Sequence, residues 1–372
     1  MARNKDVIQS LLKEANITIN GSGDCDIQVS NSAFYNRVLR DEALGLGESY
    51  MDGWWEVKNL DDFFYRLISA SLHEKIKTWK IASQILKAKI FNSGRLSKAY
   101  QVGVAHYDLG NHLFEKMLDK RMVYSCGYWK NASSLDQAQE NKLDLICRKL
   151  YLKPGMKVLD VGCGWGSFCN YAAENYGAEV VGVTISKEQA ELARQLCRNL
   201  KVDIQLLDYR KLDPDKPFDR IVSVGMFEHV GYKNYKTFMQ IMHRLLKKDG
   251  LFLLHTIGSN KSLYATDLWT DRYIFPNSML PSITQIGSSI EKLFVMEDWH
   301  NFGHYYDKTL MAWFDNFNHT WSELQSEYDD RFYRMWKYYL LSCAGAFRAR
   351  KNQLWQIVLS KNGIVNGYLP VR

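Results

Sequence analysis

The sequence predicts an α/β protein whose core is a mostly parallel sheet with helices on both faces. From residue 157 onward, short apolar segments alternate with segments of helical periodicity. The apolar segments are continuous, which is typical of strands buried on both faces. A glycine-rich turn joins the first strand to the first helix. With 372 residues and 46% hydrophobic content, the chain is long enough for about two domains with sizeable cores.

Three regions follow one another along the chain. Residues 1–95 are expected to form a small, mainly helical domain, in which Asp61 and Asp62 open a helix at the end where its dipole favours carboxylates. We expect residues 96–115 to form a linker and residues 116–372 to form the α/β domain.

The elements of the α/β domain follow from periodicity. The segments predicted to be strands are 157–161, 179–184, 204–207, 218–224, 251–256, 293–299 and 353–359. Helices are predicted at 167–176, from a cap at Ser186 to about 199, at 306–326 and at 328–348.

Composition excludes several classes of protein. No apolar run reaches the 18 residues or so that cross a bilayer. The N-terminal residues have no apolar core of the kind found in signal peptides. The seven cysteines contain no C-x-x-C pair, so neither a disulfide framework nor a metal site is indicated. The sequence therefore predicts a reduced, cytoplasmic protein.

Residues 74–101 carry much of the net charge of +7, because seven basic side chains there face one acidic side chain, Glu74. Trp79, Leu86 and Ile90 share one face of the projected helix. An anionic membrane surface would attract such a segment. A solvated linker helix packed on its own protein fits the pattern equally well. No recognisable nucleic-acid motif accompanies the charge, so no nucleic-acid partner is expected.

The glycine turn has a specific spacing. Gly162, Gly164 and Gly166 follow the pattern G-x-G-x-G, whereas dinucleotide sites have G-x-G-x-x-G, and Ser167 stands where their third glycine would be. Asp160 precedes the first glycine by two residues. The segment VLDVGCGWG resembles motif I of class I S-adenosylmethionine-dependent methyltransferases. That resemblance implies a Rossmann-like, seven-stranded, mostly parallel sheet and a cofactor site formed by these residues.

The second strand departs from this class of methyltransferases. It ends in Val183-Thr184, with no acidic residue to bind the ribose hydroxyls. Thr184 and Gln189 are the polar candidates for that role. After the third strand, Asp208-Tyr209-Arg210 stands where the class binds adenine, and Asp208 is the candidate partner of its amino group.

Further blocks resemble the cyclopropane fatty acid synthases of bacterial membrane lipids, over residues 20–372. These blocks are 107–111, 122–129, 182–186, 227–231, 254–258, 299–302 with 306–307, and 343–350. The resemblance implies transfer of a methylene group from S-adenosylmethionine to the cis double bond of an unsaturated phospholipid acyl chain, which forms a cyclopropane ring. The resemblance also implies a homodimer. Our hypothesis is that the small N-terminal domain and the basic stretch dock on anionic lipid, so that the protein associates peripherally with the inner face of the membrane.

The resemblance implies a site as well. A bound bicarbonate would serve as the base, and its ligands would be Cys126, Glu228, His255, Tyr306 and the backbone of Ile257. Our hypothesis is that the bicarbonate O–H points to Glu228 while its other oxygens accept from the remaining groups.

Three further assignments concern individual residues around that site. Tyr124 and Ser125 would contact the methionine end of the cofactor. Tyr305 competes with Tyr306 for the bicarbonate, and the register of the neighbouring residues favours Tyr306. Cys343 matches a family cysteine, so it is a catalytic candidate, but its Ala/Gly-rich surroundings favour close packing.

The implied chemistry needs a dry, aromatic cavity. Attack of an isolated alkene on the sulfonium methyl leaves a carbocation, which water would quench and aromatic faces would attract. The rings available after residue 290 are Trp299, Tyr305, Tyr306, Trp313, Phe314, Phe317 and Trp321. Two alternatives remain: a related methyltransferase giving a methyl-branched or hydroxylated product, and a catalytically silent lipid-binding scaffold.

Overall fold

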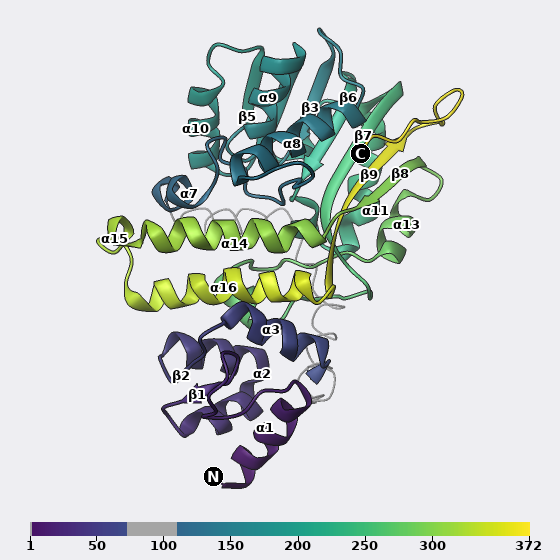
Figure 1. Ribbon diagram of the computed structural model, residues 1–372. Coiled ribbons are helices and arrows are strands. Elements are labelled where there is room, and N and C mark those ends of the chain that lie inside the picture. Colours follow the sequence, from purple (N-terminus) through teal and green to yellow (C-terminus); the bar gives the residue numbers. More distant parts are fainter. Residues whose placement is uncertain (1, 73–109) are drawn as a thin grey trace.

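The structure is a computed structural model and describes residues 2–72 and 110–372. The basic segment 74–101 and most of the expected linker lie outside the described residues. Figure 1 shows the sheet on one side of two long helices and the N-terminal helices on the other side.

The α/β part is built on the expected seven-stranded sheet, in the order β5-β4-β3-β6-β7-β9-β8. Its strands are β3 (Lys157–Val161), β4 (Glu179–Thr184), β5 (Val202–Leu206), β6 (Phe218–Val224), β7 (Leu246–Ser259), β8 (Val295–Asn301) and β9 (Asn352–Ser360). The first five are mutually parallel, and β9 runs antiparallel to both of its neighbours. All seven predicted strands are confirmed.

Helices cover both faces of the sheet, as predicted. One face is packed by α8 (Leu135–Lys149), α9 (Ser167–Tyr176) and α10 (Lys187–Leu196), and the other by α11 (Tyr235–Leu245) and α13 (Ile283–Ile290). Serine side chains cap three of these helices, because Ser134, Ser186 and Ser282 each accept a hydrogen bond from a backbone N–H of the first turn.

Element boundaries differ from the prediction at two places. The strand predicted at 251–256 extends over residues 246–259, because Leu246 already pairs with Phe218 ahead of an irregularity in the register. The helix predicted at 306–326 is divided into α14 (His304–His319) and α15 (Trp321–Leu324). The Thr320 hydroxyl between them donates to the Asn316 carbonyl oxygen over 2.8 Å, which competes with continuation of the helix.

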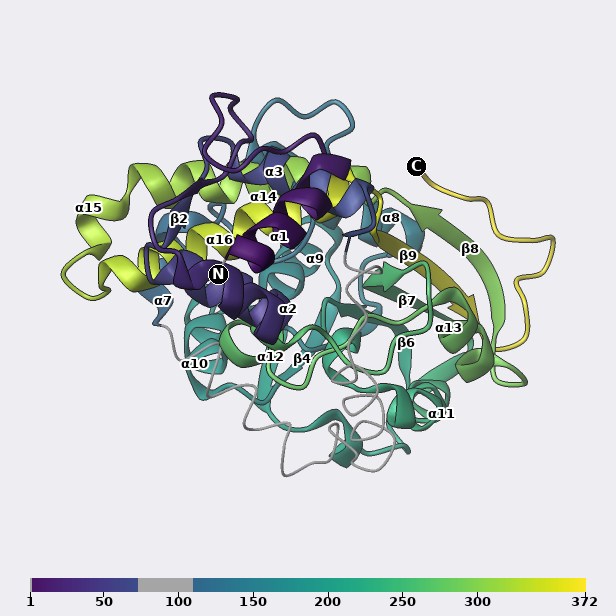
Figure 2. The same cartoon turned by 90° about the horizontal axis from the view of Figure 1, so that it is seen from below.

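The N-terminal unit consists of α1 (Ala2–Glu14), α2 (Ala33–Met51), α3 (Leu60–Ser69) and a small sheet of β1 (Gln28–Val29) and β2 (Trp55–Glu56). It packs on α16 (Asp330–Arg348), which in turn packs on α14 (Figures 1 and 2). A single apolar cluster contains fully buried side chains from both parts of the chain, such as Trp55, Phe63, Trp313 and Trp336. The other short elements of the described residues are α7 (Asn111–Met117), α12 (Leu268–Tyr273) and the 3-10 turns at 209–211, 227–229 and 232–234.

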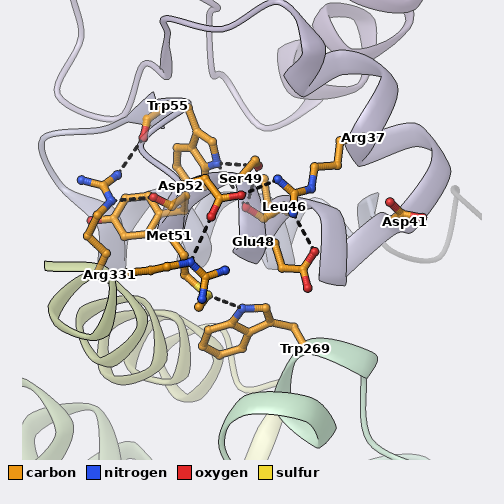
Figure 3. Close-up of polar contacts among 12 residues, drawn as sticks. Arg37, Asp41, Leu46, Glu48, Ser49, Met51, Asp52, Trp55, Trp269 and Arg331 are labelled. Atoms are coloured by element: carbon orange, nitrogen blue, oxygen red, sulfur yellow. Dashed lines mark hydrogen bonds and ion pairs between the residues drawn. The ribbon is translucent and has the colours of Figure 1, made fainter. Parts of the chain in front are cut away.

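The N-terminal unit is also fixed by polar contacts to the α/β part (Figure 3). Asp52, at the end of α2, accepts hydrogen bonds from Arg37 within its own unit and from Arg331 on α16. The indole N–H of Trp269 on α12 donates to the Met51 sulfur over 3.3 Å. Gly47 makes room for that indole, because a Cβ there would lie 2.3 Å from the ring.

Close packing between α3 and α16 depends on Gly345. A Cβ at this position would lie 2.6 Å from the Asp61 carbonyl oxygen and 2.7 Å from the Tyr65 nitrogen. Both are backbone atoms, so they cannot move aside as a flexible side chain can. Beside this contact, Arg348 forms ion pairs with Asp61 at 2.8 Å and Asp307 at 3.0 Å, which joins α3, α14 and α16.

We expect Gly345→Ala to destabilise the protein by about 1–3 kcal/mol, the usual cost of overpacking. The free energy of unfolding is measured by urea titration. Gly287→Ala is the matched control, because Gly287 also lies in a helix but has no atom within 4 Å of its virtual Cβ. That control should be neutral or stabilising by up to about 1 kcal/mol, and equal destabilisation of both variants would contradict the packing argument.

Candidate active site and cofactor pocket

A pocket opens at the carboxyl ends of β3, β4 and β6, the end at which open α/β sheets bind their ligands. The glycine turn forms one wall. Of the predicted cofactor residues, those that line it are Tyr124, Ser125, Asp160, Gly162, Gly164, Thr184, Gln189, Asp208, Tyr209 and Arg210. Gly166 lies outside the lining and precedes the first residue of α9.

The three glycines of the turn all have positive φ, which other residues adopt only at a cost. A Cβ on Gly162 would lie 2.7 Å from the Met226 side chain, so a larger residue would clash there. Gly164 has no atom within 4 Å of its virtual Cβ and lines the open pocket. Its bare backbone therefore gives a ligand close access to the chain.

The two ribose candidates contact one another. The Thr184 hydroxyl donates to Gln189 Oε1 over 3.1 Å and accepts from the Ser186 backbone N–H over 3.2 Å. Because the amide oxygen of Gln189 is engaged in this way, its NH₂ group is the donor available to a ribose hydroxyl.

Asp208, the candidate for binding adenine, is hydrogen-bonded to Arg210. Asp208 accepts hydrogen bonds from the backbone N–H and the guanidinium of Arg210, at 2.7–2.9 Å. A carboxylate has about four lone-pair sites, so Asp208 keeps acceptor capacity toward an amino group. Tyr209 packs its ring edge-on against Phe238, and burial raises the pKa of its phenol to about 12.

A second group of predicted residues meets beside this pocket. Glu228 follows β6 and His255 lies on β7, and both are buried. The backbone N–H of Ile257 donates to Glu228 Oε1 over 2.7 Å. The other carboxylate oxygen, Oε2, and the His255 Nε2 are both buried, and neither has a hydrogen-bond partner in the described part of the chain. Burial raises the pKa of Glu228 to about 7 and lowers that of His255 well below its usual value.

The contact between Glu228 and Ile257 differs from the sequence hypothesis. That hypothesis gives the Ile257 N–H to the anion, whereas in the structure this N–H is taken by Glu228. The amide thereby fixes one oxygen of the carboxylate and leaves the other as an acceptor. His255 supplies the complementary unpartnered ring nitrogen.

The two competing tyrosines point to different places. Tyr306 is buried, which raises the pKa of its phenol well above its usual value, and Cys126 and Glu228 are among the residues that influence it electrostatically. The Tyr305 ring packs instead against Tyr128, at 5.5 Å between centroids. The geometry therefore agrees with the register argument for Tyr306.

The two cysteine candidates are protonated thiols. Burial raises the pKa of Cys126 above its ordinary value and that of Cys343 to about 12. Cys343 lies two residues before Gly345, at the close contact of α16 with α3. This position supports the packing interpretation of Cys343.

Six of the seven aromatic residues expected near one cavity belong to or pack against a single apolar cluster. Within it, Phe317 packs against Trp321 and Tyr333, at 5.5 and 5.6 Å. Trp299 packs instead on Trp355, on the sheet face that α11 and α13 cover. The expectation is therefore wrong for Trp299, because its place in the sequence does not tell which face of the sheet it meets.

The rings near the site come from three elements. Tyr306 packs against Trp313 at 5.9 Å and against Phe347 of α16 at 4.5 Å. Tyr124 packs against Trp313 at 5.1 Å, and its hydroxyl lies 2.9 Å from that of Tyr339. These residues form a mostly apolar wall beside Glu228 and the pocket.

Sequence reasoning missed two buried lysines of α8. Lys142 and Lys149 are seven residues apart, so they share one face of the helix, and both are at most 1% exposed. Lys142 lines the pocket and donates to Ser125 Oγ over 2.8 Å. Burial lowers the pKa of Lys142 to about 8 and that of Lys149 to about 7. The sequence signal that could have identified these two lysines is their seven-residue spacing, which places both on the apolar face of a helix.

Two absences hold for the part of the chain that the structure describes. No group of histidine, cysteine and acidic side chains is arranged to bind a metal ion among residues 2–72 and 110–372. Within the same ranges, no helix combines the length and the apolar character that crossing a membrane requires.

The fold and the pocket define a class I S-adenosylmethionine-dependent methyltransferase. Among solved structures, a mycolic acid cyclopropane synthase in complex with SAH and CTAB is similar with a TM-score of 0.66 and 34% identity, over 70% of this chain and 98% of that one. A cyclopropane synthase from Mycobacterium tuberculosis gives the same TM-score at 30% identity and the same coverage.

The model of the mycolic acid cyclopropane synthetase family matches residues 94–357, and the chain belongs to this family. The chain is also 54% identical over 367 residues to the cyclopropane-fatty-acyl-phospholipid synthase of Escherichia coli. The aligned region covers 98% of this chain and 95% of the relative. The resemblance identified from the motifs is thereby confirmed.

We expect Gly164→Ala to weaken S-adenosylmethionine binding at least about tenfold, because the new methyl group enters the pocket and the backbone is strained. Calorimetric titration measures the dissociation constant. Gly155→Ala is the matched control: Gly155 also has positive φ and no atom near its virtual Cβ, but it lies in a turn outside the pocket. Similar loss of affinity in both variants would show that strain alone is responsible.

Proposed function

We propose that this chain transfers a methylene group from S-adenosylmethionine to the cis double bond of an unsaturated phospholipid acyl chain, with a bound bicarbonate as the base. The proposal is carried by one observation: beside the cofactor pocket, a buried carboxylate oxygen and a buried imidazole nitrogen have no hydrogen-bond partner among the residues that the structure describes. The close similarity to a cyclopropane-fatty-acyl-phospholipid synthase supports the substrate class.

The unpartnered atoms suit bicarbonate, which has one O–H donor and several acceptor oxygens. Glu228 Oε2 can accept the O–H, and a protonated His255 Nε2 can donate to another oxygen. Leaving both atoms unpaired would cost about 1–3 kcal/mol each. The electrostatic influence of Cys126 and Glu228 on Tyr306 supports the rest of the proposed ligand set.

When bound, S-adenosylmethionine supplies the electrophilic methyl group and bicarbonate supplies the base. The chain's own residues position these groups and exclude water. Tyr124, Tyr306 and Trp313 provide aromatic faces that attract positive charge on the acyl chain, worth about 0.5–2 kcal/mol each. Glu228 and His255 hold the base in one orientation, so that the proton leaving the transferred methyl group has an acceptor in place.

The alternatives predict different products. A hydroxylated product would form if water reached the cation before the ring closed. A saturated methyl-branched product would form if a hydride donor reached it first. The buried, unpartnered pair of Glu228 and His255 favours ring closure, because it provides a place for the base. A silent lipid-binding scaffold would not need the pocket lined by the glycine turn.

The decisive experiment incubates the full chain with unsaturated phospholipid vesicles, labelled S-adenosylmethionine and bicarbonate. We expect acyl chains that have gained one methylene and lost the olefinic proton signals. A retained alkene, a saturated methyl branch or an added hydroxyl would each contradict ring closure, and no transfer of label would support the scaffold.

The role of Glu228 is tested by Glu228→Gln. The amide keeps the shape of the side chain but loses the charge that orients the base, so we expect turnover to fall by about 100-fold or more while S-adenosylmethionine still binds. Glu291→Gln, an exposed glutamate at the end of α13, is the matched control. Unchanged turnover in Glu228→Gln would exclude this role.

We also propose that the chain works as a homodimer on the cytoplasmic face of the membrane, where the N-terminal domain and the basic segment 74–101 dock on anionic lipid. Vesicle co-sedimentation should then increase with the anionic lipid fraction and decrease as salt rises. Binding that is indifferent to lipid charge would contradict this mode of docking.

A further inference from the structure

Three polar side chains form a row across the three strands at one end of the sheet. His255 on β7 is paired with Gln356 on β9, and Gln356 is paired with His300 on β8. Directly paired residues of antiparallel strands point to the same face of a sheet. The row therefore lies on the face that α8 covers, between the candidate active site and the outer strand of the sheet.

The contact between Gln356 and His255 determines where the imidazole carries its proton. Gln356 Nε2 lies 3.3 Å from His255 Nδ1, and both side chains are at most 1% exposed. As the Gln356 amide is oriented in the structure, its nitrogen donates, and Nδ1 is the accepting, unprotonated nitrogen. The proton of the neutral ring is then on Nε2, a buried atom that has no hydrogen-bond partner among residues 2–72 and 110–372.

Burial and the charged groups around the row together keep the His255 ring neutral. Burial is the main cause that lowers the pKa of His255, and the charges of Lys142 and Lys149 on α8 add to it. The charge of Lys149 is itself held in place by an ion pair with Asp298 at 3.4 Å, and Asp298 is paired with Arg372 at 2.6 Å.

The outer histidine of the row has the same proton arrangement. Lys149 Nζ lies 3.0 Å from His300 Nδ1. The ion pair with Asp298 favours the ammonium form of Lys149, which only donates, so that His300 Nδ1 also accepts. Burial, followed by the charges of Lys149 and Arg372, lowers the pKa of His300 to about 3. Both ends of the row are therefore neutral imidazoles, with Gln356 between them.

We propose that Gln356 is a positioning residue, which holds His255 as the neutral tautomer with its Nε2–H directed at the base site. The inference rests on the proposed function only in what that N–H binds, namely an oxygen of bicarbonate. An Nδ1–H ring would present a lone pair to the anion, and the site would then repel the base it has to hold.

The first test measures the tautomer directly. Ring ¹⁵N-labelled histidine is incorporated into the full-length protein, and two-bond ¹⁵N–¹H correlations distinguish protonated from bare ring nitrogens. The signals of His255 are assigned by their loss in His255→Asn. We expect the Nε2–H tautomer, and an Nδ1–H tautomer would overturn the inference whatever the role of bicarbonate.

The second test changes Gln356. In Gln356→Leu the donor is lost, so we expect the Nε2–H population to fall and the bicarbonate concentration for half-maximal activity to rise about tenfold. Gln356→Glu should move the proton to Nδ1, because a carboxylate accepts, and should raise that concentration further. S-adenosylmethionine affinity should stay unchanged in both variants, which also shows that they fold.

Gln353→Leu is the matched control, since it makes the same substitution in the same strand without a contact to His255. An unchanged tautomer in Gln356→Leu would overturn the positioning role. A wild-type Nε2–H tautomer together with activity that is indifferent to bicarbonate would overturn the proposed base and leave the positioning of His255 standing.

Discussion

The site depends on the cost of removing a carboxylate and an imidazole from water. Glu228 and His255 are buried at the carboxyl ends of adjacent parallel strands, where solvent cannot satisfy them. One atom of each side chain is held by the chain: Ile257 binds one oxygen of Glu228, and Gln356 binds one nitrogen of His255. The other oxygen and the other nitrogen are buried and have no hydrogen-bond partner among the described residues. Two side chains that are each fixed by one hydrogen bond, and that each keep one atom in need of a partner, are preorganised to bind a small polar anion.

The helix α8 adds a positive potential to that arrangement. Its two buried lysines flank the candidate site, one at the cofactor pocket and one behind the outer strand. Burial weakens their preference for the charged form, and nearby aspartates restore it in part. The helix that covers the sheet is thus also part of the electrostatic environment of the reaction, which the apolar periodicity of a covering helix does not suggest.

The sequence was sufficient for the sheet and the glycine turn, because both follow from local patterns, and the family resemblance added residues that line the pocket. Continuous apolar runs identified the strands, and the G-x-G-x-G spacing identified the turn. The contact of Glu228 with Ile257, the row through Gln356 and the grouping of the rings were not predictable in this way. They join residues far apart in the chain, and they depend on how strands and helices pack. Trp299 illustrates this: it is aromatic and in the expected region, yet it lies on the other face of the sheet.

The bare backbone contact at Gly345 also bears on how the molecule can be divided. Because α3 sits directly on α16 there, the aromatic residues Phe64 and Tyr338 meet at 5.0 Å with no polar layer between them. A truncated chain that begins at α7 would expose this apolar face of α16 to water and would aggregate. The N-terminal helices therefore act as a permanent cover for the rest of the molecule, and shortening the chain would require new polar residues along α16.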